Sequence, residues 1–280
     1  METLYAADNR KKFDAVFASP GALYRDTPFW AWNCDLDPEE LKRQIRVFKE
    51  MGMGGFHMHA RTGLGTPYLS PEFMERVKEC VSTAKELDML AWLYDEDRWP
   101  SGAAGGYVTK DEKYRARYMV FTPVSNEAFG SGQASLDSSA RAKRQGNGRL
   151  LARYAVALHP DGTLQSYRRL ADGQAAAGEE TTWYAYLELT APSPWYNNQT
   201  YVNTLDKEAI ERFVQITHER YKQAVGEDFG KTVPAIFTDE PQFTHKTTLG
   251  FATDKEDVVL PWTDDFAQSF QEAYGEDLLD

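Results

Sequence analysis

The sequence predicts an α/β protein built as the N-terminal half of a TIM-type (β/α) barrel with an inserted antiparallel β subdomain. Strand and helix patterns alternate with short connections from Phe29 to Asp97, which is typical of a parallel sheet. Segment 114–190 then carries β-rich runs separated by turn residues, and the alternation resumes at Asp206. We therefore expect three parts, with the first three β-α units in 1–112, the inserted subdomain in 113–195, and the fourth β-α unit with its following helix in 196–280.

Local signals define the first three β-α units. Apolar runs predict strands at 29–33, 55–59 and 90–94. The pair Asp37–Pro38 predicts a helix start, because an aspartate side chain caps the first turn and proline fits the first helical position. The pair Ser70–Pro71 predicts the start of the second helix for the same reason, and apolar residues recur after it at helical spacing.

Four β-rich runs predict the strands of the inserted subdomain, at 118–123, 150–158, 163–167 and 182–189. The tetrapeptide 159–162, His-Pro-Asp-Gly, predicts a hairpin turn between the second and third of these strands. We expect the segments 125–148 and 171–180, which are rich in Ser, Gly and Ala, to be mobile loops.

The fourth β-α unit contains a helix over 206–225 and an apolar strand over 233–238, which we expect to be buried on both faces. A further helix is expected from Thr263. A closed barrel of this type needs eight β-α units, so the sequence leaves two interpretations, an open sheet or an incomplete barrel. A nucleotide-binding doubly wound sheet fits less well, because the Gly-rich run 101–106 has no lysine to hold phosphates and is better interpreted as a flexible active-site loop.

Composition and charge favour a small neutral ligand. Hydrophobic residues make up 42% of the 280 positions and aromatic residues 13%, which excludes a disordered chain and suits stacking against sugar rings. The formal net charge of −12 argues against nucleic acid and against an anionic membrane surface. Cys34 and Cys80 are too few for a disulfide framework, and the N-terminus lacks an apolar leader. We expect a cytoplasmic protein that binds an oligosaccharide or glycoside and needs no metal or cofactor.

Polar, acidic and aromatic residues gather at the predicted carboxyl ends of the four strands. In a barrel these ends open on one mouth, where active sites lie. Glu240, which follows the apolar run of the fourth strand, is the leading candidate for a catalytic acid, because glycoside cleavage needs a carboxyl group beside the scissile bond. The expected substrate-binding residues are Trp32, Asn33, His57, His59, Arg61, Tyr94, Asp95, Glu96, Trp99, Asn198 and Asp239.

Several of these residues have other interpretations. His57 and His59 share one face of a strand, so they bind hydroxyl groups, line the barrel through hydrogen bonds, or hold a metal ion together with a carboxylate of another strand. The carboxylates 95–97 form either a sugar-binding group or a strand end that is neutralised by Arg98. Asn198 lies in 195–201, whose composition suits a sugar-contacting loop and an ordinary turn equally.

Four segments together resemble bacterial glycoside hydrolases of the barrel-fold clan that includes β-galactosidases and, more distantly, α-L-rhamnosidase-like proteins. The segments are 28–33 (PFWAWN), 54–61 (GGFHMHAR), 92–102 (WLYDEDRWPSG) and 237–242 (FTDEPQ). The resemblance covers most of 28–112 and 196–280.

The resemblance implies a role for the fourth strand end. Glu240 occupies the place of the clan's acid/base glutamate, and Asp239 stands where the clan usually has asparagine. The clan's nucleophile lies on a seventh strand that these residues do not reach, which implies the N-terminal half of a larger enzyme. The implied partner is the other half of the barrel, and a homo-oligomer is the alternative. Because rhamnosidase-like relatives can invert, retention and inversion both stay open.

Our leading hypothesis is a glycosidase that cleaves terminal sugars from oligosaccharides by carboxylate acid/base catalysis. Two alternatives remain. One is a metal-dependent hydrolase on a β/α barrel that uses the pair His57 and His59, and the other is a non-catalytic carbohydrate-binding protein. Removal and return of metal ions would identify the first, and sugar binding without turnover would identify the second.

Overall fold

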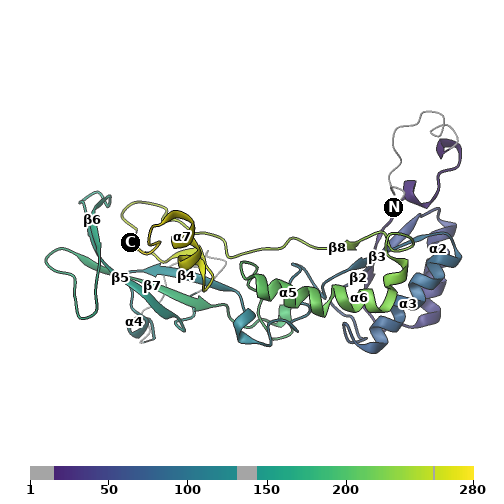
Figure 1. The fold of residues 1–280 in the computed structure, drawn as a ribbon, viewed down its shortest axis with the longest axis horizontal. Helices are drawn as coiled ribbons and strands as arrows, with labels where there is room; N and C mark the ends of the chain where they lie inside the picture. The colour runs from purple at the N-terminus through teal and green to yellow at the C-terminus, as the bar shows by residue number, and fades with distance from the viewer. Residues whose placement is uncertain (1–15, 131–143, 255) are drawn as a thin grey trace. The chain divides into compact units, whose positions relative to one another are not determined.

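The computed structural model describes residues 16–130, 144–254 and 256–280. The N-terminal stretch and the middle of the predicted loop 125–148 therefore lie outside the described residues. The chain is a mixed α/β protein with two compact units, each assembled from separate stretches of chain (Figure 1). The first unit comprises Met1–Val108, Trp195–Asn197 and Ile210–Pro241, and the second comprises Thr109–Pro194, Asn198–Ala209 and Gln242–Asp280.

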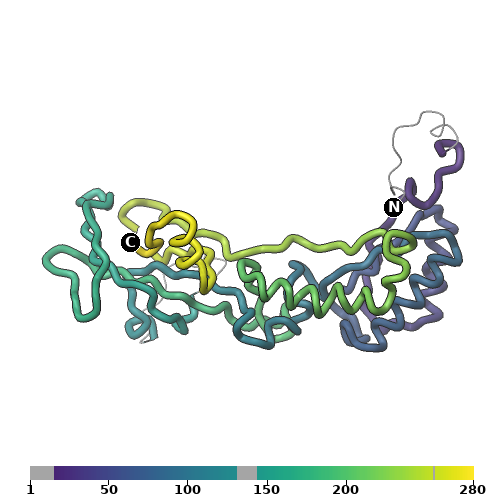
Figure 2. Tube along the Cα trace, viewed as in Figure 1, coloured from purple at the N-terminus to yellow at the C-terminus, as the bar shows by residue number. Residues whose placement is uncertain are grey.

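The chain passes between the two units more than once. Figure 2 traces it out of the first unit after β3, back into that unit through α5 and α6, and out again after β8. Among the described residues, no helix is long and apolar enough to cross a membrane. Cys34 is exposed and Cys80 is buried, and both are free thiols.

A parallel sheet of four strands forms the centre of the first unit. Its strands, in spatial order, are β1 (Phe29–Trp32), β2 (Gly55–Ala60), β3 (Leu90–Tyr94) and β8 (Ile236–Phe237). Phe29 lies opposite His57 in the first pair, and Leu93 lies opposite Ile236 in the last. The predicted parallel sheet is therefore confirmed, and the carboxyl ends of its strands lie along one edge.

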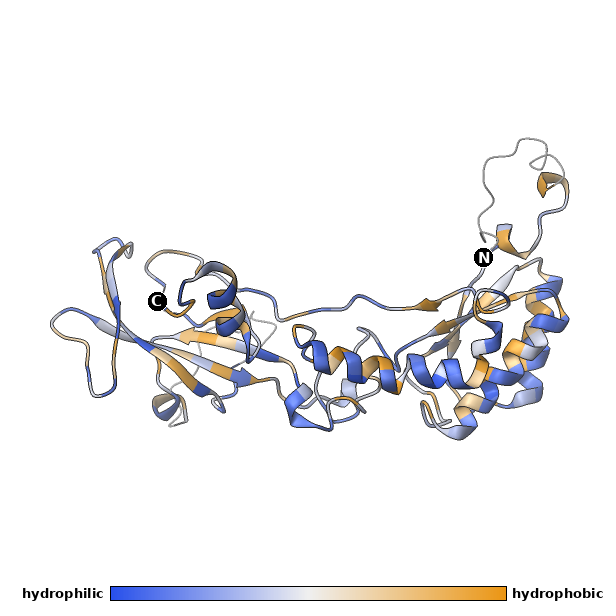
Figure 3. Ribbon diagram, in the orientation of Figure 1, coloured by the Kyte–Doolittle hydropathy of each residue, from blue (hydrophilic) through white to orange (hydrophobic). Residues whose placement is uncertain are grey.

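The helices of the first unit are α2 (Pro38–Glu50), α3 (Pro71–Glu86), α5 (Lys207–Ile216) and α6 (His218–Val225). Both predicted caps are confirmed. Asp37 Oδ1 accepts the N–H of Glu40 at 2.8 Å, and Ser70 Oγ accepts the N–H of Phe73 at 3.1 Å. Figure 3 shows hydrophilic and hydrophobic bands alternating along α2 and α3, the pattern of helices with one buried face.

One face of the parallel sheet packs on these helices through aromatic rings. The Trp30 ring lies 5.5 Å from Phe48 of α2, and the Trp32 ring lies 5.5 Å from Phe73 of α3. Phe56 of β2 belongs to the same layer and is completely buried. Burial of a side chain of this size contributes about 2–3 kcal/mol, so this layer anchors the sheet and leaves its other face for the site.

The helix predicted over 206–225 is broken at Thr217, between α5 and α6. The Thr217 hydroxyl donates to Phe213 O at 2.8 Å, and a side-chain bond of this kind to the preceding turn bends helices. The break places His218 at the start of α6.

The buried strand predicted over 233–238 is wrong in length and in burial. Only Ile236 and Phe237 have strand conformation, and both are half-buried. The physical reason is that β8 pairs with β3 on one side, while no strand of the described chain pairs with its other edge.

An antiparallel sheet of five strands forms the second unit and confirms the predicted antiparallel subdomain. Its strands, in spatial order, are β6 (Leu164–Arg169), β5 (Arg149–Leu158), β7 (Thr181–Leu189), β4 (Arg117–Thr122) and β9 (Val258–Pro261). The predicted hairpin turn is present between β5 and β6, where His159 N–H donates to Thr163 O at 2.8 Å.

Two parts of the second unit differ from the sequence-based expectation. Part of the predicted loop 125–148 is the short helix α4 (Asn126–Gly130). Residues 242–280 were expected beside the fourth β-α unit, yet β9 and α7 (Phe266–Tyr274) belong to the second unit. Strand pairing decides this, because β9 pairs with β4 through positions such as Leu260 opposite Met119.

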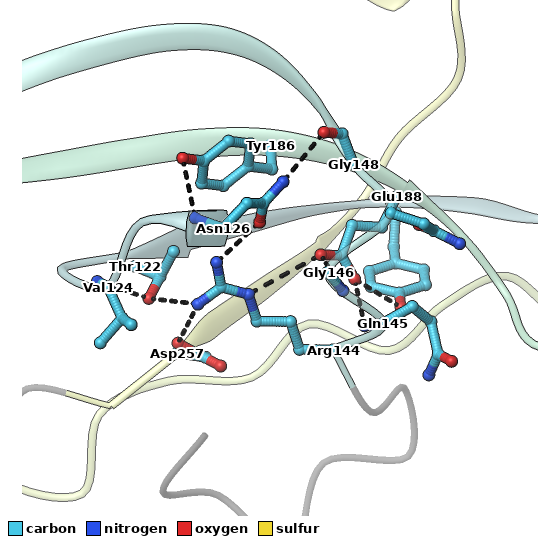
Figure 4. Close-up of polar contacts among 12 residues, drawn as sticks. Thr122, Val124, Asn126, Arg144, Gln145, Gly146, Gly148, Tyr186, Glu188 and Asp257 are labelled. Carbon is cyan, nitrogen blue, oxygen red and sulfur yellow. Dashed lines mark hydrogen bonds and ion pairs between the residues drawn. The ribbon is translucent and has the colours of Figure 1, made fainter. Parts of the chain in front are cut away.

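A buried ion network holds segments of the second unit together. Figure 4 shows the guanidinium of Arg144 between two carboxylates, 3.7 Å from Glu188 and 3.9 Å from Asp257. Glu188 also accepts the hydroxyl of Tyr118 at 3.1 Å and the N–H of Gln145 at 2.6 Å. All three ionic side chains are buried, so loss of the cation would leave two carboxylates uncompensated.

Candidate active site

A pocket of about 480 Å³ opens at the carboxyl ends of the parallel strands in the first unit. It contains two carboxylates, two basic side chains and three aromatic rings. The lining residues are Phe29, Ala31, His59, Arg61, Trp99, Phe237, Asp239 and Glu240. Four of the residues predicted for the site from the sequence, His59, Arg61, Trp99 and Asp239, therefore meet Glu240 in one pocket.

Glu240 is an exposed residue of the pocket wall. Its φ of +36° lies in the left-handed region, which residues other than glycine rarely adopt. The preceding residue is held from both sides by Ser101, whose N–H donates to Asp239 O at 2.7 Å and whose Oγ accepts the Asp239 N–H at 2.9 Å. The backbone that carries Glu240 is therefore fixed although β8 is short.

Asp239 is half-buried beside Glu240, and the Tyr94 hydroxyl donates to its Oδ2 at 3.3 Å. Burial, and next the charge of Asp239, raise the pKa of Tyr94, so this hydroxyl stays a hydrogen-bond donor. One oxygen of Asp239 is thereby engaged, and the carboxylate is oriented within the pocket.

Aromatic rings cover the face of the sheet that lies opposite to the helices. The ring of Phe29 lies 5.1 Å from His57, 4.8 Å from His59 and 5.3 Å from Phe237. These contacts confirm the prediction that the two histidines share one face of their strand. A layer of this kind supplies the apolar surface on which a sugar ring can rest.

The two histidines are held by the protein in neutral form. His57 Nδ1 lies 3.1 Å from Thr27 O, and His59 Nδ1 lies 3.2 Å from Ala60 O. Burial lowers the pKa of both, and the neighbouring Arg61 cation helps to bring the pKa of His59 from 6.5 to about 4. Nδ1 of each ring is directed to a backbone carbonyl, which leaves Nε2 as the atom for other contacts.

The acidic run after β3 is directed into the protein. Asp95 and Glu96 are 0% and 1% exposed, which differs from the expectation that they bind sugar hydroxyls directly. The oxygens of Asp95 accept the hydroxyls of Ser101 and Thr238, both at 2.6 Å, and His218 Nε2 lies 2.9 Å from Oδ2. Asp95 thus connects β3 with α6 and with the end of β8.

Glu96 organises the Gly-rich segment that follows. Its Oε1 accepts the N–H groups of Asp97 and Gly105, and its Oε2 accepts those of Gly102 and Ala104, at distances between 2.5 and 3.0 Å. Burial raises the pKa of Glu96 to about 8, while the four N–H donors favour the charged form. Segment 101–106, expected to be a flexible active-site loop, is therefore tied to one carboxylate.

Asp97 forms the ion pair expected for this strand end. Arg98 lies 3.0 Å from Asp97 Oδ2, and the Asn197 amide donates to the same oxygen at 3.0 Å. Next to this group, the indole N–H of Trp195 donates to Trp99 O at 2.6 Å. These contacts hold Trp99, which is 40% exposed, at the pocket wall.

Three of the predicted binding residues lie elsewhere. Trp32 is 1% exposed and packs on the helices, because it alternates with Ala31, which lines the pocket. Asn33 is exposed but does not line the pocket. Asn198 belongs to the second unit, where its N–H donates to Ser193 O at 3.0 Å, whereas the side chain of the adjacent Asn197 donates to Asp97.

Sequence reasoning did not assign His218 or Ser101 to the site. His218 falls within the helix predicted over 206–225, and Ser101 falls within the predicted flexible loop 101–106. The available signal was the acidic run 95–97, since buried carboxylates require donors from elsewhere in the chain.

Within the described part of the chain, the arrangement of metal-ligating side chains and a second cavity both bear on the choice of site. Among the described residues, no group of three or more His, Cys, Asp or Glu side chains is arranged to hold a metal ion. A larger cavity of about 630 Å³ lies in the second unit and is lined mainly by apolar residues such as Trp183 and Trp262. The smaller pocket is taken as the candidate site, because it contains the adjacent carboxylates Asp239 and Glu240.

The chain was compared with known families, curated proteins and solved structures, and structural likenesses were found. No family model matches the sequence, and no curated protein matches it. The chain is similar in structure to a rhamnosidase from Novosphingobium sp. PP1Y, with a TM-score of 0.53 and 13% sequence identity. The similarity covers 95% of this chain and 42% of that one, so this chain spans less than half of the rhamnosidase. At this identity the likeness concerns the fold alone.

Proposed function

We propose that the chain is part of a glycoside hydrolase, that its parallel sheet is half of a (β/α) barrel, and that Glu240 is the general acid. The observation that carries the proposal is the position of Glu240, at the carboxyl end of β8 in a pocket with Asp239, Arg61 and Trp99. The structural likeness to a rhamnosidase supports it. Carboxyl ends of parallel strands are where barrel enzymes carry their chemistry.

The residues of the pocket suit the steps of glycoside cleavage. Glu240 would give its proton to the departing glycosidic oxygen as the bond to the anomeric carbon breaks, and water would then add to that carbon. Asp239 and Arg61 would bind hydroxyl groups of the sugar, while the rings of Trp99 and Phe29 would cover its apolar face. A second carboxylate would be either the nucleophile, with Glu240 then taking the proton of the attacking water, or the general base that takes this proton itself. Its distance from Glu240 would be about 5–5.5 Å for retention and about 6.5–9.5 Å for inversion.

The proposal is tested with Glu240→Gln in the complete protein. Wild type and variant are compared on aryl glycosides, beginning with aryl α-L-rhamnosides, that carry either a phenyl or a 2,4-dinitrophenyl leaving group. Loss of a general acid should lower kcat on the phenyl substrate by about 10²–10⁴-fold, and much less on the activated substrate, whose leaving group needs no proton.

The matched control is Glu86→Gln, an exposed glutamate at the end of α3, which should behave as wild type. Near-normal turnover of the phenyl substrate by Glu240→Gln would remove Glu240 from the mechanism. Sugar binding by the complete protein without turnover of any glycoside would favour a carbohydrate-binding protein instead.

A further inference from the structure

We propose that His218 is a positioning residue for Glu240 and that it acts through Asp95 and Ser101. The inference rests on the proposed role of Glu240 as general acid. All four residues belong to the first unit, yet they come from α6, from the segment after β3 and from the end of β8. Hydrogen bonds join them in a continuous chain.

The centre of this chain is the fully buried carboxylate of Asp95. His218 Nε2 lies 2.9 Å from Oδ2, and the Thr238 hydroxyl donates to the same oxygen at 2.6 Å. The Ser101 hydroxyl donates to the other oxygen at 2.6 Å. A buried carboxylate keeps one orientation only while its donors hold it, so His218 helps to fix both oxygens.

The next link is the contact between Ser101 and Asp239. The Ser101 hydroxyl, which donates to Asp95, also accepts the Asp239 N–H at 2.9 Å, and the Ser101 N–H donates to Asp239 O at 2.7 Å. Ser101 therefore forms hydrogen bonds with both the backbone N–H and the backbone carbonyl of Asp239. A rotation of the Asp95 carboxylate would displace the Ser101 hydroxyl, and with it the peptide that precedes Glu240.

The last link is the backbone of Glu240 itself. A φ of +36° in a glutamate persists only where the surrounding structure fixes it. The Thr238 hydroxyl and the backbone of Asp239 are both tied to Asp95, the first directly and the second through Ser101, while Tyr94 holds the Asp239 carboxylate. The side chain of His218 is 31% exposed, and besides its bond to Asp95 its ring lies 5.7 Å from the ring of Phe213.

The experiment compares His218→Leu with His218→Gln in the complete protein, using the aryl glycoside that the wild type turns over. Leucine cannot donate to Asp95, whereas glutamine keeps a donor. A misplaced general acid should lower kcat of His218→Leu on the phenyl glycoside by about 10–100-fold and leave KM within about 3-fold. The 2,4-dinitrophenyl glycoside should be affected by less than about 3-fold, and His218→Gln should recover most of the loss.

A purely structural role gives a different result. Partial unfolding lowers the amount of active enzyme, so kcat would fall equally on both substrates, and this outcome would overturn the proposal. In the Glu240→Gln background, His218→Leu should cause no further loss on the phenyl substrate, and an additive loss would also overturn it. His159→Gln, at an exposed histidine of the second unit, is the control and should match wild type.

A second variant covers the case in which His218→Leu does not fold. Ser101→Ala removes the next link and leaves His218 in place, and it should show the same loss confined to the phenyl substrate. Wild-type behaviour of Ser101→Ala overturns the proposal. If Glu240→Gln itself is fully active, the proposed function fails. If Glu240→Gln is impaired and His218→Leu is not, only the positioning role fails.

Discussion

Replacement of Glu96 by glutamine tests whether one buried carboxylate organises the Gly-rich segment. In the structure each carboxylate oxygen of Glu96 accepts two backbone N–H groups. The amide nitrogen of glutamine would take the place of one oxygen, so two N–H groups would face a donor. An unpaired buried donor costs about 1–3 kcal/mol, so the two N–H groups together cost about 2–6 kcal/mol, and this cost is partly offset because glutamine carries no buried charge.

The assay is denaturant unfolding of the complete protein at pH 9. Burial raises the pKa of Glu96 to about 8, so the wild-type carboxylate is charged at this pH. Amide hydrogen exchange should show that Gly102, Ala104 and Gly105 lose protection in the variant. The control is Glu86→Gln, at an exposed position, which should change stability by less than about 0.5 kcal/mol. Unchanged protection of the Gly102, Ala104 and Gly105 N–H groups in Glu96→Gln would refute the reasoning.

The remaining predictions concern one histidine and one arginine. The pKa of His59 is about 4 in the folded protein and 6.5 in the unfolded chain. Between pH 4 and pH 6.5 the unfolded chain therefore binds a proton at His59 that the folded protein does not bind. The free energy of unfolding should therefore rise by about 3 kcal/mol from pH 4 to pH 6.5, and His59→Phe should lack this rise in pH-dependent unfolding. Arg144→Met should destabilise the second unit by about 3–5 kcal/mol in thermal or denaturant unfolding, because Glu188 loses its cation.

Each of these predictions has a matched control. His159→Gln changes an exposed histidine and should keep the wild-type rise between pH 4 and pH 6.5. Arg149→Met removes an exposed ion pair with Asp264 and should cost less than about 1 kcal/mol. A pH slope in His59→Phe as steep as in the wild type would contradict the first prediction. Equal stability of the two arginine variants would contradict the second.

Local signals explain what the sequence could predict of this fold. The caps at Asp37 and Ser70 act within one turn, and the alternation along β2 depends only on neighbouring positions, so these elements were predictable. The break at Thr217 depends on one side-chain bond within a continuous helical pattern. The assignment of β9 to the antiparallel sheet depends on pairing with β4, which lies far away in sequence and leaves no local signal.

The candidate site also contains features that the sequence could predict and features that it could not. The position of Glu240 at a strand end was predictable, because an apolar run stops there and acids begin. The inward direction of Asp95 and Glu96 was not, because it depends on donors supplied by His218 and by segment 101–106. Sequence reveals which residues gather at an edge of a sheet, whereas the direction of each side chain is set by partners from other elements.

The interleaved path of the chain has a consequence for biosynthesis. β3 pairs with β8, which is made only after the strands β4 to β7 of the second unit. On the ribosome, one edge of the nascent parallel sheet therefore stays open while most of the other unit emerges. An open edge of this kind is a site for unwanted strand pairing, so the growing polypeptide would depend on chaperones to protect this edge until Ile236 arrives.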